Sequence, residues 1–220
     1  MARYICVTSV HGIVTAQDDP AFADILNAAD IATPDGMPVV WALRSFGCEN
    51  QQRVYGPTLM LKLCQSAALH GQRVFLYGGR EDTLGLLVSR LHRQFPNLEI
   101  AGVLSPPFRA LTEEEKGDIR QRILQSNCDV VFVGISTPKQ ERWMHENRYY
   151  FPGATLVGVG AAFDFHAGRT KQAPAWMQRN GLEWLFRLAM EPTRLWKRYL
   201  FTTPRFLPLW LKQKLRSSAG

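Results

Sequence analysis

Short apolar runs alternate with longer amphipathic patterns through most of the chain. Residues 129–134 and 155–160 show no alternation of apolar and polar side chains, which is typical of strands covered on both faces of a sheet. The other expected strands are residues 4–7, 73–77 and 98–103, and the expected helices are residues 20–29, 37–44, 58–70, 82–95 and 112–126. Strands that alternate with helices predict an α/β fold, a Rossmann-like sandwich with a mainly parallel sheet.

Several of the expected helices carry capping residues. Asp19 precedes Pro20, as an N-cap precedes a proline at the first helical position. Thr112 and Glu115 have the spacing of a capping box. Gly71 follows the helix at residues 58–70, where a glycine in a left-handed conformation commonly ends a helix.

The composition is that of a folded chain. The 220 residues are 46% hydrophobic, and no run of 18 apolar residues occurs, so we expect no segment that spans a bilayer. The first residues have too short an apolar stretch for a signal peptide, which indicates a cytoplasmic protein. The four cysteines, at positions 6, 48, 64 and 128, are far apart and are expected to be reduced, packed side chains.

The last quarter of the chain differs in charge from the rest. Residues 165–220 hold 11 Lys and Arg against 2 Asp and Glu, whereas residues 1–164 hold 15 and 17. The basic residues are interleaved with Trp, Phe and Leu, a combination that suits an anionic membrane surface. Two other interpretations stay open: a basic tail that clamps the phosphates of nucleic acid, or core helices with a solvated basic face.

The change in composition divides the chain into a core at residues 1–176 and a basic, amphipathic helical appendage at residues 177–220. Pro192 is expected to break the appendage into two helices, because the residue before a proline disfavours helix. In the second helix the spacing places three cations on one face, with the apolar residues on another. These cations are Arg194, Lys197 and Arg198.

Four loops follow expected strands, at the sheet edge where ligands bind in parallel α/β folds. They hold Thr8 and Ser9, the turn Pro34-Asp35-Gly36, the turn Gly78-Gly79-Arg80, and residues 136–142. Asp35 lies between Pro and Gly in a tight turn, where its carboxylate can face a cleft and act as a general base toward a hydroxyl. An Asp after Pro can equally form an Asx-turn or cap a helix, and both the catalytic and the structural interpretation stay open.

The two later loops have polar groups that suit a nucleotide sugar. The backbone N–H groups of Gly78 and Gly79 can approach a phosphate, with Arg80 beside them, although Gly-Gly is also a plain turn. Gln140 can hydrogen-bond a sugar hydroxyl or a uracil edge. It shares the start of a helix with Glu141 and Arg142, which can also be an ordinary solvated first turn.

The sequence holds no Asp-x-Asp pair to bind a metal on a nucleotide diphosphate, and no Walker or zinc-protease motif. We therefore expect no metal and no cofactor. The histidines at positions 11, 70, 92, 145 and 166 show no ligand spacing, so we expect them to be solvated or packed.

Several of these segments together resemble the TagA/WecG/CpsF glycosyltransferases, glycosyltransferase family twenty-six. The segments that carry the resemblance are residues 29–44, 75–79, 129–143, 157–168, 172–178, 181–188 and 191–199. The resemblance implies an inverting transferase that moves a sugar, of the N-acetylmannosamine type or another hexosyl, from a UDP-sugar to a polyprenyl-diphosphate-linked saccharide. It implies an enzyme of cell-surface polysaccharide synthesis at the cytoplasmic face of the plasma (inner) membrane.

The resemblance also implies roles for single residues. Asp35 matches the proposed catalytic base. The expected contacts to the UDP-sugar are Thr8, Ser9, Gly36, Gly78, Gly79, Arg80, Gln140, Glu141 and Arg142. The contacts that the resemblance implies for the lipid diphosphate are Arg187, Arg194 and Arg198, and the helix spacing adds Lys197 as a contact to the lipid or membrane.

One loop departs from the family pattern, and one other function stays open. Many members have Thr-Leu-Asn after the first strand, where this chain has Val7-Thr8-Ser9, so either Thr8 or Ser9 can take the polar role. We expect no nucleic acid partner and leave a homo-oligomer open. The competing interpretation is a nucleic-acid- or nucleotide-binding α/β protein whose basic tail clamps phosphates.

Overall fold

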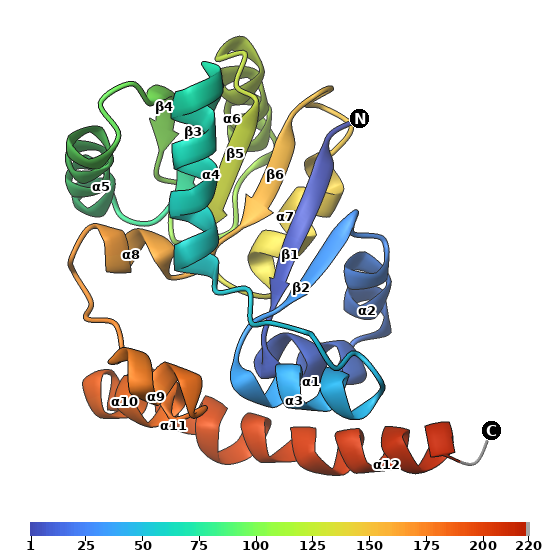
Figure 1. The fold of residues 1–220 in the computed structure, drawn as a ribbon. Helices are drawn as coiled ribbons and strands as arrows, with labels where there is room; N and C mark the ends of the chain where they lie inside the picture. The colour runs from blue at the N-terminus through green and yellow to red at the C-terminus, as the bar shows by residue number, and fades with distance from the viewer. Residues whose placement is uncertain (219–220) are drawn as a thin grey trace. The chain divides into compact units, whose positions relative to one another are not determined.

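The structure, a computed structural model, describes residues 1–218 and is shown in Figure 1. The strands are β1 (Arg3–Thr8), β2 (Ile31–Pro34), β3 (Arg73–Gly78), β4 (Glu99–Leu104), β5 (Val130–Gly134) and β6 (Thr155–Gly158). The helices before residue 170 are α1 (Val10–Asp18), α2 (Pro20–Asn27), α3 (Met37–Ser45), α4 (Gly56–His70), α5 (Glu81–Gln94), α6 (Glu113–Gln125), α7 (Lys139–Asn147) and α8 (Ala162–His166). All the strands expected from the sequence are present, and the structure has one further strand, β2, that was not expected.

The strands form one six-stranded sheet in the order β2-β1-β6-β5-β3-β4. The pairs β1–β6, β5–β6, β3–β5 and β3–β4 are all parallel. The expected α/β fold with a mainly parallel sheet is therefore confirmed.

By its internal contacts the chain divides into two compact units. Unit 1 consists of residues 1–7, 25–32 and 56–171, and unit 2 consists of residues 8–24, 33–55 and 172–220, of which the last two residues lie outside the described part. Unit 2 thus joins the C-terminal segment that begins at residue 172 to segments from the first quarter of the chain.

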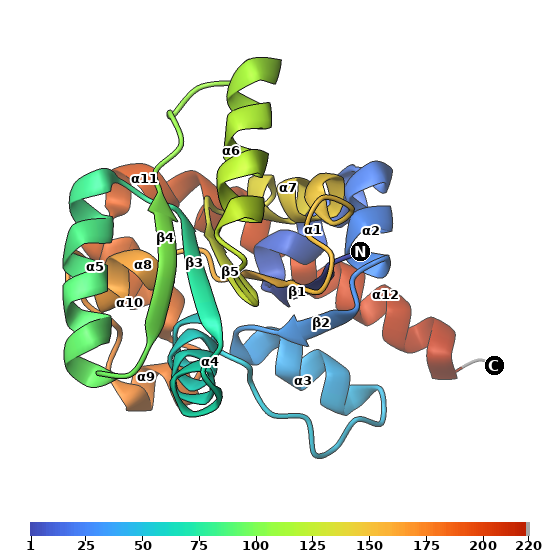
Figure 2. The ribbon, with the colours of Figure 1, turned by 90° about the horizontal axis from the view of Figure 1, so that it is seen from above.

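The core of unit 1 lies on both faces of its strands. Alternate residues of β3 and β5 point to opposite faces, as the pleat of a strand requires. Val74 and Phe132 pack with α4, α5 and α8 on one face. Tyr77 and Val131 pack with α6 and α7 on the other, and Figure 2 shows these helices on the two sides of the strands. Burial on both faces explains why these strands show no apolar–polar alternation.

Unit 2 has a smaller apolar core of its own. Val14 of α1, Val39 of α3 and Phe206 of α12 (Phe206–Ser218) are buried together. Trp210 of α12 donates from Nε1 to the Ser45 hydroxyl at 2.8 Å, which fixes one end of this packing. The tail is therefore packed on α1 and α3.

The remaining part of unit 2 consists of short helices before α12. These are α9 (Ala175–Arg179), α10 (Glu183–Met190), α11 (Pro192–Lys197), the π-helical turn η1 (Arg198–Thr202) and the 3-10 turn η2 (Thr203–Arg205). The break expected at Pro192 is confirmed, because α10 ends at Met190 and α11 begins at Pro192, but the expectation of only two helices is wrong, since α9, η1, η2 and α12 are also present. Among the described residues, none of the helices has both the length and the apolar character needed to cross a bilayer.

The capping signals of the sequence are borne out. The Asp19 carboxylate accepts from the Phe22 N–H at 3.0 Å. Thr112 and Glu115 form the reciprocal hydrogen bonds of a capping box at α6. Helix α1 was not expected, because Gly12 falls inside it and its first residues follow β1 at once. Its buried Val10 and Val14, four residues apart, are the periodic signal that could have indicated a helix.

Candidate active site

In unit 2 a cavity of about 100 Å³ opens beside the carboxylate of Asp35. The charged and imidazole side chains that line it are His11, Asp35, Arg53, Glu183, Arg187 and Arg198. Two carboxylates and three guanidinium groups thus face one small cavity. Such a collection of charges suits a ligand that is itself anionic and rich in hydroxyl groups.

Asp35 is held by the turn between β2 and α3. Its N–H donates to the Thr8 carbonyl at 2.9 Å, and the next residue, Gly36, has φ of +89°, a conformation that favours glycine. Gly36 is the N-cap of α3, and no side-chain hydrogen bond caps that helix. The carboxylate of Asp35 therefore does not cap α3 and pairs with Arg53 instead.

Arg53 joins the two carboxylates of the cavity. Its Nε and Nη2 both lie 2.9 Å from Oδ1 of Asp35, and its Nη2 lies 2.6 Å from Oε2 of Glu183. The guanidinium also lies over the ring of Tyr55, at 4.1 Å from the centroid. The three charged side chains are 13–23% exposed, so this ion triad is screened from water on most sides but still reaches the cavity.

Burial raises the pKa of Asp35 above its ordinary value. The Arg53 guanidinium opposes that rise, and the negative charge of Glu183 adds to it. The pKa of Arg53 is raised by its two carboxylates, despite its own burial. A carboxylate whose pKa is raised toward neutrality is a better proton acceptor, so the electrostatics of the cavity suit a general base.

The cations expected from the sequence do not all lie in one place. Arg187 and Arg198 line the cavity, and Arg198 donates to the Ser9 hydroxyl at 3.3 Å. The Nε of Arg198 is buried and has no hydrogen-bond partner among the described residues. Because burial lowers its pKa, the charge of Arg198 is held at a cost and can be stabilised by an anion.

Arg194 and Lys197 lie on the surface instead. Arg194 pairs with Glu191 at 2.6 Å, and the Lys197 ammonium lies over the ring of Trp196 at 5.6 Å. The three cations predicted for one face thus divide, with Arg198 turned inward and the other two exposed.

Three charged or imidazole residues of the cavity, Arg53, Glu183 and His11, were not predicted from the sequence as site residues. Arg53 lies in a polar stretch without a recognisable motif, shortly before a helix, and this position alone gives little indication of a role in the site. His11 was expected to be solvated or packed, and it is packed. Burial and the charge of Arg198 lower its pKa to about 4, so it is neutral at physiological pH, and its buried Nδ1 has no partner in the described chain.

In unit 1, Gln140 and Glu141 are buried rather than solvated. Each is 2% exposed. Oε1 of Glu141 accepts from Nε2 of Gln140 at 2.9 Å and from the Thr137 hydroxyl at 2.8 Å, while Oε1 of Gln140 accepts from the Gly160 N–H at 3.0 Å. Gly158 makes room for this pair, because a Cβ there would lie 3.0 Å from Gln140 Nε2. The side chain of Arg142, the third expected contact, is half-buried.

Gly78 and Gly79 are used in the packing of the sheet. A Cβ at Gly78 would lie 2.6 Å from the backbone of Gly134, and the Gly79 N–H donates to the Gly134 carbonyl at 3.2 Å. Arg80 is exposed and lies 3.5 Å from Asp82. The glycines are thus explained by close backbone approach, and their expected role toward a nucleotide stays a prediction.

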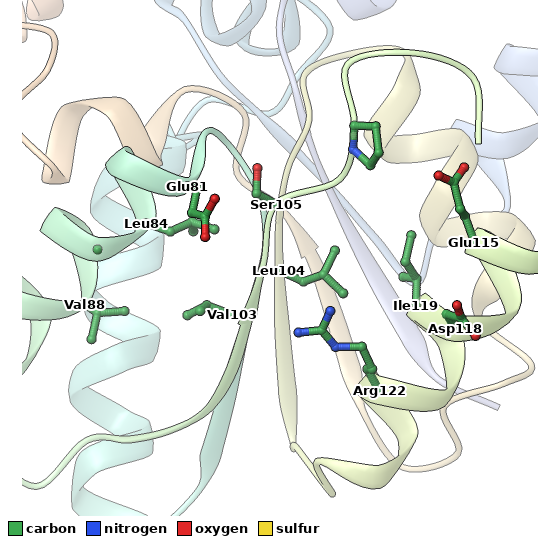
Figure 3. Close-up of a pocket in the computed structure, with 12 residues that line it drawn as sticks. Glu81, Leu84, Val88, Val103, Leu104, Ser105, Glu115, Asp118, Ile119 and Arg122 are labelled. Atoms are coloured by element: carbon green, nitrogen blue, oxygen red, sulfur yellow. The ribbon is translucent and has the colours of Figure 1, made fainter. Parts of the chain in front are cut away.

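A larger hollow of about 640 Å³ lies in unit 1 between α5 and α6, over the edge strand β4 (Figure 3). Its floor is apolar, with Leu84 and Leu104 among its residues. Its charged side chains are Glu81, Glu115, Asp118 and Arg122, of which Glu115 already pairs with Arg109 at 2.6 Å. This acidic rim is a poor match for a diphosphate, so the smaller cavity at Asp35 is the better candidate despite its size.

Comparison with known proteins agrees with the motifs. The family model described as "Glycosyl transferase WecG/TagA/CpsF family" matches residues 1–220. An N-acetylglucosaminyldiphosphoundecaprenol N-acetyl-beta-D-mannosaminyltransferase of Bacillus subtilis strain 168 is 34% identical over 89% of this chain and 74% of its own length. The protein of the same name from Bacillus spizizenii strain W23 is 34% identical over 93% of this chain and 76% of its own. The chain therefore belongs to the WecG/TagA/CpsF family of glycosyl transferases.

Proposed function

We propose that the chain transfers a sugar of the N-acetylmannosamine type, or another hexosyl group, from a UDP-sugar to a saccharide linked to polyprenyl diphosphate. The names of the two relatives support this acceptor class and this type of sugar. The observation that carries the proposal is the cavity itself, where the carboxylate of Asp35 faces the guanidinium groups of Arg187 and Arg198. A base suits proton removal from the acceptor hydroxyl, and the guanidinium groups suit binding of the acceptor diphosphate.

Asp35 acts as the general base in this proposal. As the acceptor hydroxyl oxygen bonds to the anomeric carbon of the donor, its proton passes to Asp35. The bond between that carbon and the diphosphate oxygen breaks, and its electron pair leaves on UDP. Because the acceptor attacks from the face opposite to UDP, the configuration at the anomeric carbon is inverted. Both contacts of Arg53 fall on Oδ1 of Asp35, which leaves Oδ2 for the proton.

Arg187 and Arg198 stabilise the diphosphate of the acceptor. Guanidinium groups form strong, charge-assisted hydrogen bonds to phosphate oxygens. The Nε of Arg198 is buried and has no hydrogen-bond partner in the described residues, while its Nη2 donates to the Ser9 hydroxyl. The residues expected at the UDP-sugar in unit 1, namely Gly78, Gly79, Arg80, Gln140, Glu141 and Arg142, remain part of the proposal, together with Thr8, Ser9 and Gly36.

The appendage at residues 177–220 attaches the enzyme to the cytoplasmic face of the membrane in this proposal. Its helix α12 exposes Leu207, Leu211 and Leu215, which lie four residues apart on one stripe and are 51–73% exposed. Lys212 and Lys214 flank the stripe. An apolar stripe flanked by cations can lie among lipid headgroups, where each cation contributes about 1 kcal/mol.

A transfer assay tests the proposed reaction. A panel of UDP-sugars is incubated with a short-chain N-acetylglucosaminyl lipid diphosphate, and the glycosylated lipid is measured. We expect transfer from one or a few donors. No transfer from any UDP-sugar, with an intact and folded enzyme, would contradict the proposed donor class.

Co-sedimentation with anionic liposomes, compared with DNA binding at several salt concentrations, tests the tail. We expect binding to liposomes and weaker binding after replacement of Leu207, Leu211 and Leu215 by Ser. Tight DNA binding that survives these replacements would favour the nucleic-acid alternative.

A further inference from the structure

Arg53 contacts the carboxylates of both Asp35 and Glu183, and this sharing affects how readily Asp35 can accept a proton. The same Nη2 atom lies 2.9 Å from Asp35 and 2.6 Å from Glu183, so Glu183 makes the shorter contact. The ring of Tyr55 under the guanidinium restricts where that group can turn. Glu183 thus holds Arg53 at one edge while Asp35 takes the other.

The charges that face Asp35 show what Glu183 adds. Arg53 contacts Asp35 directly, and Arg187 and Arg198 face it from α10 and η1. His11 of α1 is neutral, and burial together with the two carboxylates raises the pKa of Tyr55, so neither of these brings charge at neutral pH. Without Glu183, one carboxylate would face three guanidinium groups and would be a weak base.

A simpler explanation of Glu183 is structural. It is the first residue of α10, where an acidic side chain is favoured by the helix dipole. A helix-dipole interaction alone would allow the side chain to remain in solvent. The Glu183 side chain is instead only 14% exposed and contacts Arg53.

We propose that Glu183 is a positioning residue for the transfer reaction: it shares Arg53 with Asp35, so that Arg53 orients the base without suppressing its basicity. This inference rests on the proposed function of Asp35. It predicts that Glu183 acts through the charge balance of the cavity, beyond any contribution to folding.

The test is the pH profile of kcat/KM for the full chain with Glu183→Gln. The substitution keeps the shape of the side chain but removes the negative charge that raises the pKa of Asp35. The pKa of Asp35 should therefore fall, and the acidic limb of the profile should move to lower pH by on the order of one unit. The plateau rate should fall as well, because Asp35 becomes a weaker base. Glu183→Asp, which keeps the charge, should leave the limb near its wild-type position.

Asp18→Asn is the matched control. It also removes one carboxylate that pairs with an arginine of unit 2, Arg205 at 2.6 Å, but Asp18 lies at the surface outside the cavity. The limb should not move in this variant. If it stays in place in Glu183→Gln as well, while Asp35→Asn is inactive, Glu183 has only a structural role and the inference is wrong.

A titration of the Asp35 carboxyl carbon by NMR separates this inference from the proposed function. The signal is assigned by its loss in Asp35→Asn, and it needs no activity. A lower pKa of Asp35 in Glu183→Gln supports the inference even where transfer fails, and an unchanged pKa overturns it. An active Asp35→Asn protein instead contradicts the proposed base.

Discussion

Asp35 and Arg53 show what the sequence can and cannot predict at the scale of a residue. Asp35 stands in a Pro-Asp-Gly turn after a strand, so its position at the carboxyl end of that strand, where α/β folds commonly bind ligands, followed from local sequence. Arg53 is 18 positions away in a stretch without a motif, and only the folded chain brings it to 2.9 Å from Asp35. Long-range pairing of this kind leaves no local signal.

Arg198 gives a prediction at the same scale. Arg198→Ala should raise KM for the lipid-diphosphate acceptor and lower kcat/KM by about ten- to a thousandfold, because it removes a buried cation that faces the cavity. Arg198→Lys should restore part of the loss, since it keeps the charge without the fork of donors. Steady-state kinetics with a water-soluble acceptor measure both variants.

The control for that experiment is Arg205→Ala. Arg205 lies on the same tail but pairs with Asp18 at the surface, where an ion pair contributes little. Its kinetics should remain close to those of the wild type. An Arg198→Ala protein that is folded and has unchanged acceptor kinetics would refute the role of Arg198.

At the scale of elements, most strands and helices were predictable and the tail was predictable only in part. The strands of the sheet and the caps at Asp19 and Thr112 have short-range causes. Whether α12 would pack on α1 and α3 was not visible in the sequence, because Phe206 and Trp210 have the same character as the exposed Leu207 and Leu211 beside them.

A truncation before Met177 tests the role of the appendage. It removes Glu183, Arg187 and Arg198 from the cavity, so transfer should be lost even to a water-soluble acceptor, and liposome binding should fall. Unit 1, with its own apolar core, should remain folded by circular dichroism. If the truncated chain transfers sugar at the full rate, the appendage is only a membrane anchor and its predicted role in the active site is wrong.

That truncation also uncovers apolar side chains of unit 2. Val14 and Val39 lose the cover of Phe206, so the truncated chain is expected to be less soluble. A milder companion, Phe206→Ala, removes one packing contact and retains the cations. It should lose stability, by about 3–5 kcal/mol, before it loses acceptor binding.

For the whole molecule, the charge asymmetry of the sequence has a structural counterpart. Most of the basic last quarter, from residue 172 on, belongs to unit 2, which also contains Asp35, whereas unit 1 holds the acidic hollow between α5 and α6. The division into two units that each use separate parts of the chain could not be predicted, since composition changes only once along the sequence.

Metal dependence is a property of the whole enzyme. We predict that transfer continues in EDTA, because the sequence has no Asp-x-Asp pair to hold a metal on the UDP diphosphate, and Arg80 with the N–H groups of Gly78 and Gly79 is proposed to stabilise that diphosphate instead. The measurement is the transfer rate with EDTA, with Mg²⁺ and with Mn²⁺. Activity that disappears in EDTA and returns with either ion would show that a metal takes part.

The central claim is that Asp35 is the base of the transfer reaction, and Asp35→Asn tests it most directly. The amide keeps the size of the side chain and can still accept from Arg53, but it cannot take a proton from the acceptor hydroxyl. With donor binding and thermal unfolding checked as controls, the account predicts a transfer rate about 10²–10⁴-fold below that of the wild type. A folded Asp35→Asn protein that transfers sugar at nearly the wild-type rate would contradict it.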